Sequence, residues 1–172
     1  YNRQKNQQML MYILKAIEAK NPSKDFCLIS VGRGHTQKDV EQLASKLGVD
    51  GKVRFLGQRT DVPKLLNAMD MFFLPSLFEG FPIVAIEAQT AGLPLVIADT
   101  ISKEVELTNL VHWLPIDKGA EVWAEKYYQI AHTKVNRVQY APIVERKGFD
   151  ARHSAQILQD IYVKNILRNE NS

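Results

Sequence analysis

Apolar residues recur at the spacing i, i+3, i+4 and i+7 in three stretches of the chain, which predicts three amphipathic helices. Their apolar faces are Leu10, Ile13, Leu14 and Ile17; Val40, Leu43, Ala44 and Leu47; and Val62, Leu65, Leu66 and Met69. Asn21-Pro22-Ser23 is expected to end the first helix, and Gly48 to cap the second. Further helices are expected from about Ile83 to Thr90, around residues 123–131 and around residues 158–166.

Short apolar segments lie between the predicted helices and are expected to be strands. They are residues 26–31, 53–56, 71–74, 95–97 and, more weakly, 111–114. Their apolar residues are continuous rather than alternating, which is typical of strands buried on both faces of a parallel sheet. Cys27 lies inside the first of them and is expected to be a buried thiol. The alternation of strands and helices predicts one α/β domain over residues 1–172, with a doubly wound, Rossmann-like parallel sheet flanked by helices.

In such folds ligands bind at the carboxyl ends of the strands, which directs the search for chemistry to the loops that follow them. Those loops are Gly32-Arg33-Gly34, Gly57-Gln58-Arg59, Pro75 to Pro82 and Asp99 to Ser102. The first is no dinucleotide-binding fingerprint, because Gln37 stands where the third glycine would be. An ordinary loop remains the alternative there. Arg59 is a candidate neighbour of a base or phosphate, against the alternative of a solvated charge.

The loop from Pro75 to Pro82 is the most informative, because it joins a buried strand to a helix. Pro82 suits the first turn of that helix, and Gly80 permits a tight backbone and the close approach of a ligand. Free N–H groups at the helix start form a site that favours anions. Glu79 and Glu87, separated by seven residues, can border one pocket. An ordinary strand–turn–helix with two solvated glutamates is the alternative.

Composition and charge narrow the classes of protein. Of 172 residues, 45% are hydrophobic and 24% charged, which excludes a disordered, collagen-like or disulfide-rich chain. The net charge of +3 suits an anionic small molecule or membrane face and does not demand nucleic acid. No apolar run is long enough to span a membrane. The start at Tyr1, without Met, leads us to expect a fragment of a longer protein.

Several motifs follow one another along the chain: Val53 to Gly57, Asp61 to Leu66, Phe73-Leu74-Pro75-Ser76, Glu79-Gly80-Phe81-Pro82, Glu87-Ala88 and Ala91 to Val96. Together they resemble the donor-binding half of retaining GT-B glycosyltransferases of the group 1 type, glycosyltransferase family 4. The resemblance covers the chain from about Arg3 to the terminal helix. Asp99 to Val105 looks like members found in bacterial exopolysaccharide and capsule pathways. The resemblance implies one half of a GT-B fold.

The family assigns roles to charged residues at matching positions. The resemblance implies that Glu87 accepts hydrogen bonds from ribose hydroxyls and that Glu79 contacts the transferred sugar. An Arg and a Lys after the first strand neutralise the donor diphosphate in the family. Lys5 matches that Lys, and the matching Arg would fall just before Tyr1. Glu79 and Lys5 are thus the candidate catalytic residues, although a Lys near a chain start is by itself usually a solvated charge.

The other donor-binding positions that the resemblance implies lie in the loops and at the helix start. They are Gly32, Gly57, Arg59, Gly80, Phe81, Pro82, Ile83 and Val84. Because proline has no N–H, only the amides of Phe81, Ile83 and Val84 can hold sugar hydroxyls or phosphate oxygens. The loop at Gly57 would hold the base, partly through backbone atoms.

The implied function is metal-independent, retaining transfer of a sugar from a nucleotide sugar, expected to be UDP-linked, to a polysaccharide or lipid-linked acceptor. The sequence contains no Asp-x-Asp, and its four histidines lack metal-ligand spacing, so no metal or other cofactor is expected. We expect an acceptor-binding domain, and most of the first strand, to precede Tyr1, and the 172 residues alone to be inactive. The resemblance implies a cytoplasmic protein, with the inner face of the membrane as a second location. Two alternatives remain: a nucleotide-sugar epimerase domain, or a non-enzymatic, doubly wound nucleotide-binding module.

Overall fold

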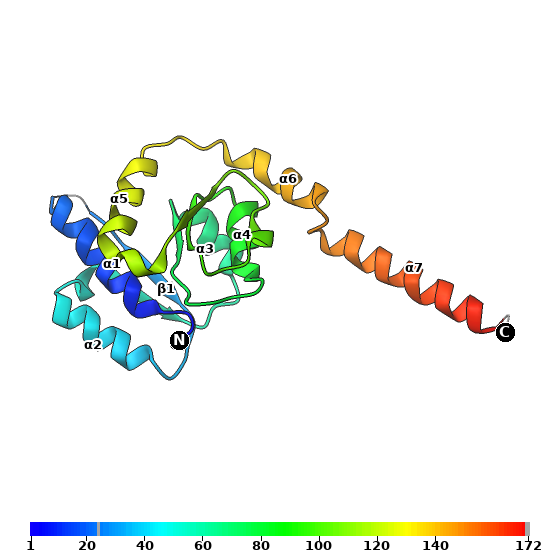
Figure 1. Ribbon diagram of the computed structural model, residues 1–172, viewed down its shortest axis with the longest axis horizontal. Helices are drawn as coiled ribbons and strands as arrows, with labels where there is room; N and C mark the ends of the chain where they lie inside the picture. Colours follow the sequence, from blue (N-terminus) through cyan, green and yellow to red (C-terminus); the bar gives the residue numbers. More distant parts are fainter. Residues whose placement is uncertain (24, 171–172) are drawn as a thin grey trace.

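The computed structural model describes residues 1–23 and 25–170, and for residues 151–154 and 165–170 it describes the backbone alone. Within this part the chain alternates strands and helices (Figure 1). The strands are β1 (Leu28–Val31), β2 (Val53–Gly57), β3 (Phe72–Leu74), β4 (Leu95–Ala98) and β5 (Val111–Leu114). The α-helices are α1 (Gln7–Lys20), α2 (Gln37–Leu47), α3 (Val62–Ala68), α4 (Ile83–Thr90), α5 (Ala120–Ile130), α6 (Tyr140–Arg146) and α7 (Ala151–Glu170). Short 3₁₀ helices are η1 (Asp50–Lys52), η2 (Lys103–Val105), η3 (Ile116–Lys118) and η4 (Arg137–Gln139).

All strand pairs in the described part are parallel, which confirms the predicted α/β class. The strands form two ladders, β1–β2 and β3–β4–β5, rather than one continuous sheet. The start of the chain lies between the ladders at their carboxyl ends. The backbone nitrogen of Tyr1 donates to the Arg33 carbonyl beyond β1, and the amide of Leu77 beyond β3 donates to the Gln4 carbonyl. Residues 1–4 therefore connect the two halves of the domain.

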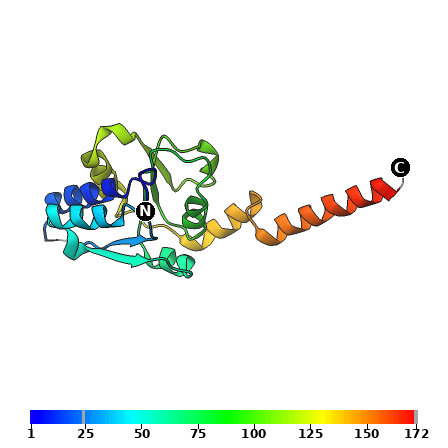
Figure 2. The ribbon, with the colours of Figure 1, turned by 90° about the horizontal axis from the view of Figure 1, so that it is seen from below.

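Two apolar clusters form the core, and each belongs to one ladder. The larger contains all of β4, which is completely buried, together with Trp123 of α5 and Leu66 of α3. The smaller joins α1 and α2 to the β1–β2 ladder around Met11 and Val40. Helices α1 and α2 lie side by side on the side of the body opposite α7 (Figure 2). Helical spacing therefore predicted most of the inward faces of α1 and α2, although it missed the fully buried Met11.

Two sequence-based predictions about strands and helices need correction. Strand β1 begins at Leu28 rather than Phe26, and Cys27 is exposed rather than buried, because the chain reaches its parallel partner β2 only at the Leu28–Val53 pair. The stretch around residues 136–146 contains a helix, α6, that the sequence pattern did not predict. It packs against α4 and buries Tyr140 and Val144.

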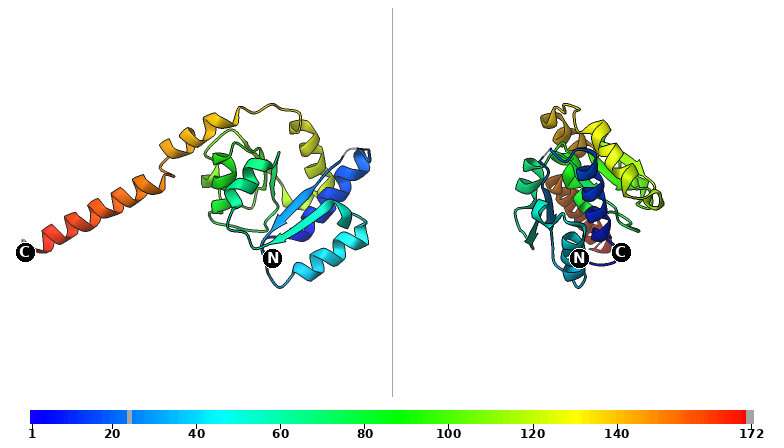
Figure 3. Two further views of the ribbon diagram at one scale, coloured as in Figure 1. Left: turned by 180° about the vertical axis from the view of Figure 1, so that it is seen from behind. Right: turned by 90° about the vertical axis from the view of Figure 1, so that its left-hand side faces the viewer.

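Helix α7 follows α6 and extends away from the rest of the chain (Figures 1 and 3). Its described side chains are exposed, including the apolar Ile157, Leu158, Ile161 and Tyr162. None of the described helices is both long and apolar enough to cross a membrane.

Candidate active site at the start of α4

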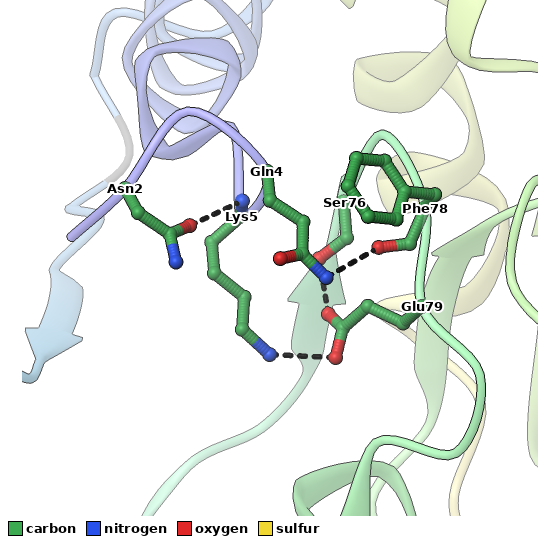
Figure 4. Close-up of polar contacts among 6 residues, drawn as sticks. All are labelled: Asn2, Gln4, Lys5, Ser76, Phe78 and Glu79. Atoms are coloured by element: carbon green, nitrogen blue, oxygen red, sulfur yellow. Dashed lines mark hydrogen bonds and ion pairs between the residues drawn. The ribbon is translucent and has the colours of Figure 1, made fainter.

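Loop 75–80, between β3 and α4, carries Glu79, whose carboxylate accepts hydrogen bonds from two side chains (Figure 4). The Ser76 hydroxyl donates to Oε1 of Glu79 at 2.5 Å, and the ammonium group of Lys5 donates to Oε2 at 2.6 Å. The Glu79 side chain is 6% exposed, whereas Lys5 is 39% exposed. The structure thus brings together the two residues that the sequence singled out as catalytic, although 74 positions separate them. A nearly buried carboxylate is tolerated here because it is paired and hydrogen-bonded.

The segment before α1 holds Lys5 beside this loop through hydrogen bonds to the backbone of the loop. Gln4 donates from Nε2 to the Phe78 carbonyl at 2.9 Å and accepts from the Leu77 amide at 2.8 Å. Asn6 donates from Nδ2 to the Pro75 carbonyl at 3.1 Å. Asn6 has a φ of 49°, a left-handed conformation that Asn tolerates better than most residues. Lys5 is therefore held on a segment that is itself fixed on both sides.

Loop 99–102, beyond β4, supports loop 75–80 from the other side. Thr100 donates from Oγ1 to the Ser76 carbonyl at 2.9 Å. The Ser102 amide donates to the Glu79 carbonyl at 3.2 Å, and Glu79 forms a parallel bridge with Ile101. The backbone of Glu79 is thus anchored independently of its side chain.

The start of α4 presents first-turn amides beside this loop. Pro82 is buried and occupies the N-cap rather than the first turn, which begins at Ile83. The amides of Ile83 and Val84 belong to the first turn of α4, whose N–H groups lack the i−4 carbonyl that serves later residues of a helix. Phe81 stacks its ring on Phe149, with centroids 5.6 Å apart and planes at 11°. The helix start thus offers donors at the surface, next to exposed apolar side chains.

The backbone conformation at position 80 does not require a glycine. Its φ lies outside the left-handed region, and a Cβ there would meet no atom within 4 Å. The structure therefore shows open space beside Gly80 rather than a left-handed turn that only glycine could make.

Glu87 lies apart from Glu79. It is half-buried and lines a cavity of about 380 Å³ between α3, α4, η4 and α6. The other lining residues are Pro63, Asn67, Thr90, Ala91, Arg137, Val138 and Ala141, and loop 75–80 is not among the described residues that line it. Glu79 therefore does not border this cavity, and the shared pocket stays a prediction. Glu87 is the fifth residue of α4, four positions and about 6 Å along the helix from Ile83.

The two glycine-containing loops beyond β1 and β2 lie side by side. Gly32, with a φ of 125°, donates from its amide to the Gly57 carbonyl at 2.7 Å, and Gly57 has a φ of 65°. Other residues rarely adopt these conformations, so both glycines are explained. Arg59 is engaged by Asp61 through two hydrogen bonds of 2.8 Å, and this guanidinium lowers the pKa of the Asp61 carboxyl. The structure does not bring Arg59 to the Lys5–Glu79 pair.

Sequence reasoning assigned no role to Ser76, Gln4 or Thr100, all of which hold the loop in place. Ser76 stands directly after Pro75 in one of the quoted motifs, so its position was visible. Its contact with Glu79 was not, because serine in a loop is common and the direction of its hydroxyl depends on the folded loop. No cluster of three or more potential metal ligands occurs among the described residues.

The sequence was also compared with those of known proteins, and the matches are glycosyltransferases. Residues 1–132 match the family model described as Glycosyl transferases group 1. The chain is 31% identical over 154 residues to the putative glycosyltransferase EpsF of Bacillus subtilis, covering 88% of this chain and 40% of that protein. It is 33% identical over 137 residues to the lipopolysaccharide glucosyltransferase WaaG of Escherichia coli, covering 78% and 34% respectively.

A solved structure shows the same fold. HepE of Anabaena, crystallised with UDP and glucose, superposes with a TM-score of 0.76 at 23% identity, over 95% of this chain and 46% of that one. The chain thus spans less than half the length of each of these proteins. Because the family model covers most of the chain and the fold agrees, this chain belongs to the group 1 glycosyltransferase family.

Proposed function

We propose that this chain is the donor-binding part of a retaining glycosyltransferase that works without a metal ion. It would take a sugar from a UDP-linked donor and pass it to a polysaccharide or lipid-linked acceptor. The observation that carries this proposal is the contact between Lys5 and Glu79, at the strand–helix loop that opens onto the first-turn amides of α4. A nucleotide sugar could bind here with its diphosphate near the cation and the helix start, and with its sugar near the carboxylate.

The chemistry follows from where charge develops. When the bond between the anomeric carbon and the diphosphate breaks, the leaving diphosphate gains negative charge. Lys5 and the amides of Ile83 and Val84 would stabilise that charge in place of a metal ion. Glu79 would stabilise the positive character on the sugar. The acceptor hydroxyl would form its bond on the face that the diphosphate leaves, and its proton would pass to the departing phosphate.

The Lys5–Glu79 pair has to open for this to happen. Lys5 is partly exposed on a flexible four-carbon stem, so it can turn towards a diphosphate. Sugar hydroxyls would then replace its ammonium group as donors to Glu79. The pair would thus keep both groups neutralised until the donor arrives.

The nucleoside would lie further along α4, towards Glu87. A vicinal diol suits a carboxylate acceptor, and Glu87 lines the cavity described above. UDP is favoured as the nucleotide because the similar HepE binds UDP and glucose in its crystal. A second relative, 34% identical over 97 residues (56% of this chain and 25% of its own length), is a galactosyltransferase of Escherichia coli. Its name gives UDP-Gal as donor and a diphosphoundecaprenol-linked acceptor.

The test is a calorimetric titration of the chain with UDP, GDP and ADP, with and without EDTA. We expect UDP to bind most tightly, EDTA to leave its affinity unchanged, and Glu87→Ala to weaken it about 10-fold through loss of hydrogen bonds to a charged group. Glu121→Ala, an exposed carboxylate on α5, is the matched control. Binding that EDTA abolishes, or a folded chain that binds no nucleotide, would contradict the proposal.

A further inference from the structure

Ser76 has no contact with solvent, and its hydroxyl is directed at a single acceptor. It is 0% exposed, and Oγ lies 2.5 Å from Oε1 of Glu79. Its own carbonyl accepts from the Thr100 hydroxyl, which fixes the backbone from which the side chain projects. A serine has one rotatable side-chain bond before its hydroxyl, so this donor cannot move far once the backbone is held.

The two donors to Glu79 differ in how firmly they are held. Lys5 is partly exposed and long, whereas Ser76 is buried and short. When Lys5 turns to a diphosphate, as the proposed function requires, Ser76 is the side-chain donor that stays. A carboxylate has about four lone-pair sites, so the Ser76 bond leaves room for sugar hydroxyls on the same group.

We propose that Ser76 is a positioning residue, which holds the Glu79 carboxylate in the orientation that accepts hydroxyls of the donor sugar. This inference rests on the proposed function, because it needs a sugar at Glu79. Ser76 would not touch the nucleotide, and it would act on the sugar through Glu79 alone. Loss of its hydroxyl frees the carboxylate to rotate, so the sugar loses a preorganised partner while the diphosphate keeps Lys5.

The experiment measures the affinities of the full-length protein for UDP and for UDP-glucose, UDP-galactose and UDP-N-acetylglucosamine by calorimetry. For the donor that binds best, Ser76→Ala should weaken binding about 10-fold, the loss of one hydrogen bond to a charged group, and leave UDP affinity within about twofold. A structural role alone would weaken both ligands together. Thr108→Val removes another buried hydroxyl, whose partners are Gln89 and the Leu110 amide rather than Glu79, and should change neither affinity.

A second variant separates this inference from the proposed function. Glu79→Gln should produce the same selective loss, and adding Ser76→Ala to it should cost nothing further, because the two act as one unit. Selective loss in Glu79→Gln but none in Ser76→Ala would overturn the role of Ser76 and leave the function standing. No nucleotide binding by the parent protein would overturn both. If Ser76→Ala does not fold, a crystal structure of the parent protein with UDP-glucose decides, because a Ser76 hydroxyl turned away from Glu79 contradicts the proposal.

Discussion

At the scale of single residues, the site depends on one ion pair of unequal partners. Glu79 is almost fully covered and Lys5 is not, so removing Lys5 leaves a buried carboxylate with Ser76 as its remaining side-chain donor. Removing one partner of a buried ion pair lowers the stability of the fold by more than the intact pair contributes, because the other charge is left buried and unpaired. Both function and local stability are therefore sensitive at these positions.

Lys5→Ala should lower kcat of the full-length enzyme on the order of 10²- to 10³-fold, the scale for one lost preorganised charge contact. The measurement is a transfer assay at saturating donor. Lys15→Ala is the control, because Lys15 forms a comparable but solvated pair with Glu18 on α1. A rate that falls less than about twofold would show that Lys5 does not meet the leaving group.

Gln89 is a second residue with a large structural role, unrelated to the ion pair. It is fully buried; its Nε2 donates to the carbonyls of Ala85 and Val105, and its Oε1 accepts from Leu107 and Thr108. Gln89→Leu should lower the free energy of unfolding by about 3 kcal/mol, because several buried polar groups lose their partner. Urea denaturation measures this, with Gln129→Leu, at an exposed position on α5, as control. A loss below about 1 kcal/mol would contradict this account.

At the scale of elements, α4 is the centre of the proposed donor site. Its start presents amides, its middle carries Glu87, and its buried Gln89 ties it to the segment after η2. Its end turns at Gly92, where η4 crosses. There Arg137 donates to the carbonyls of Asn67 and Met69, at the end of α3. Helices α3 and α4 and segment η4 are thus fastened together around the cavity that Glu87 lines.

Gly92→Ala should loosen this junction. The φ of 67° disfavours any side chain, and a Cβ would lie 2.7 Å from Cα of Arg137. The two penalties together should lower the free energy of unfolding by about 3 kcal/mol. Gly51→Ala is the control, since nothing lies within 4 Å of its Cβ position. Equal unfolding midpoints for both variants in urea would show that the Arg137 backbone moves aside at little cost.

At the scale of the whole molecule, the division of the sheet is the main structural feature. Strand β1 pairs on one side with β2, and β3 pairs on one side with β4. Half of the N–H and C=O groups of a parallel strand point to each side, so a strand with one neighbour leaves the other half without a strand partner. We propose that a strand before Tyr1 pairs with both β1 and β3, since Tyr1 and Gln4 already bond to the segments that follow these strands.

Extending the chain upstream should therefore raise its melting temperature and slow amide hydrogen exchange in β1 and β3. The amides that now lack a strand partner would gain one. Exchange in β4 should change little, because that strand has neighbours on both sides. Unchanged exchange in β1 and β3 on extension would contradict a shared strand.

The sequence by itself determined what depends on local spacing. Helical periodicity placed α1, α2 and α3, and continuous apolar segments placed the strands. Ordered motifs identified the family, and the resemblance pointed to the pair Lys5 and Glu79. Strand starts were less certain, as exposed Cys27 shows, because burial there depends on which neighbouring strand the chain meets.

Only the tertiary structure decided which of these residues meet. It joined Lys5 to Glu79 across 74 positions, turned Ser76 towards the same carboxylate, moved Glu87 to a separate cavity and added α6 against α4. The physical reason is that side-chain periodicity indicates the type and the buried face of a single helix or strand, and not which other elements it contacts. Contacts between loops depend on crossovers, strand register and the hydrogen bonds that fix each loop, and none of these has a local signature in the chain.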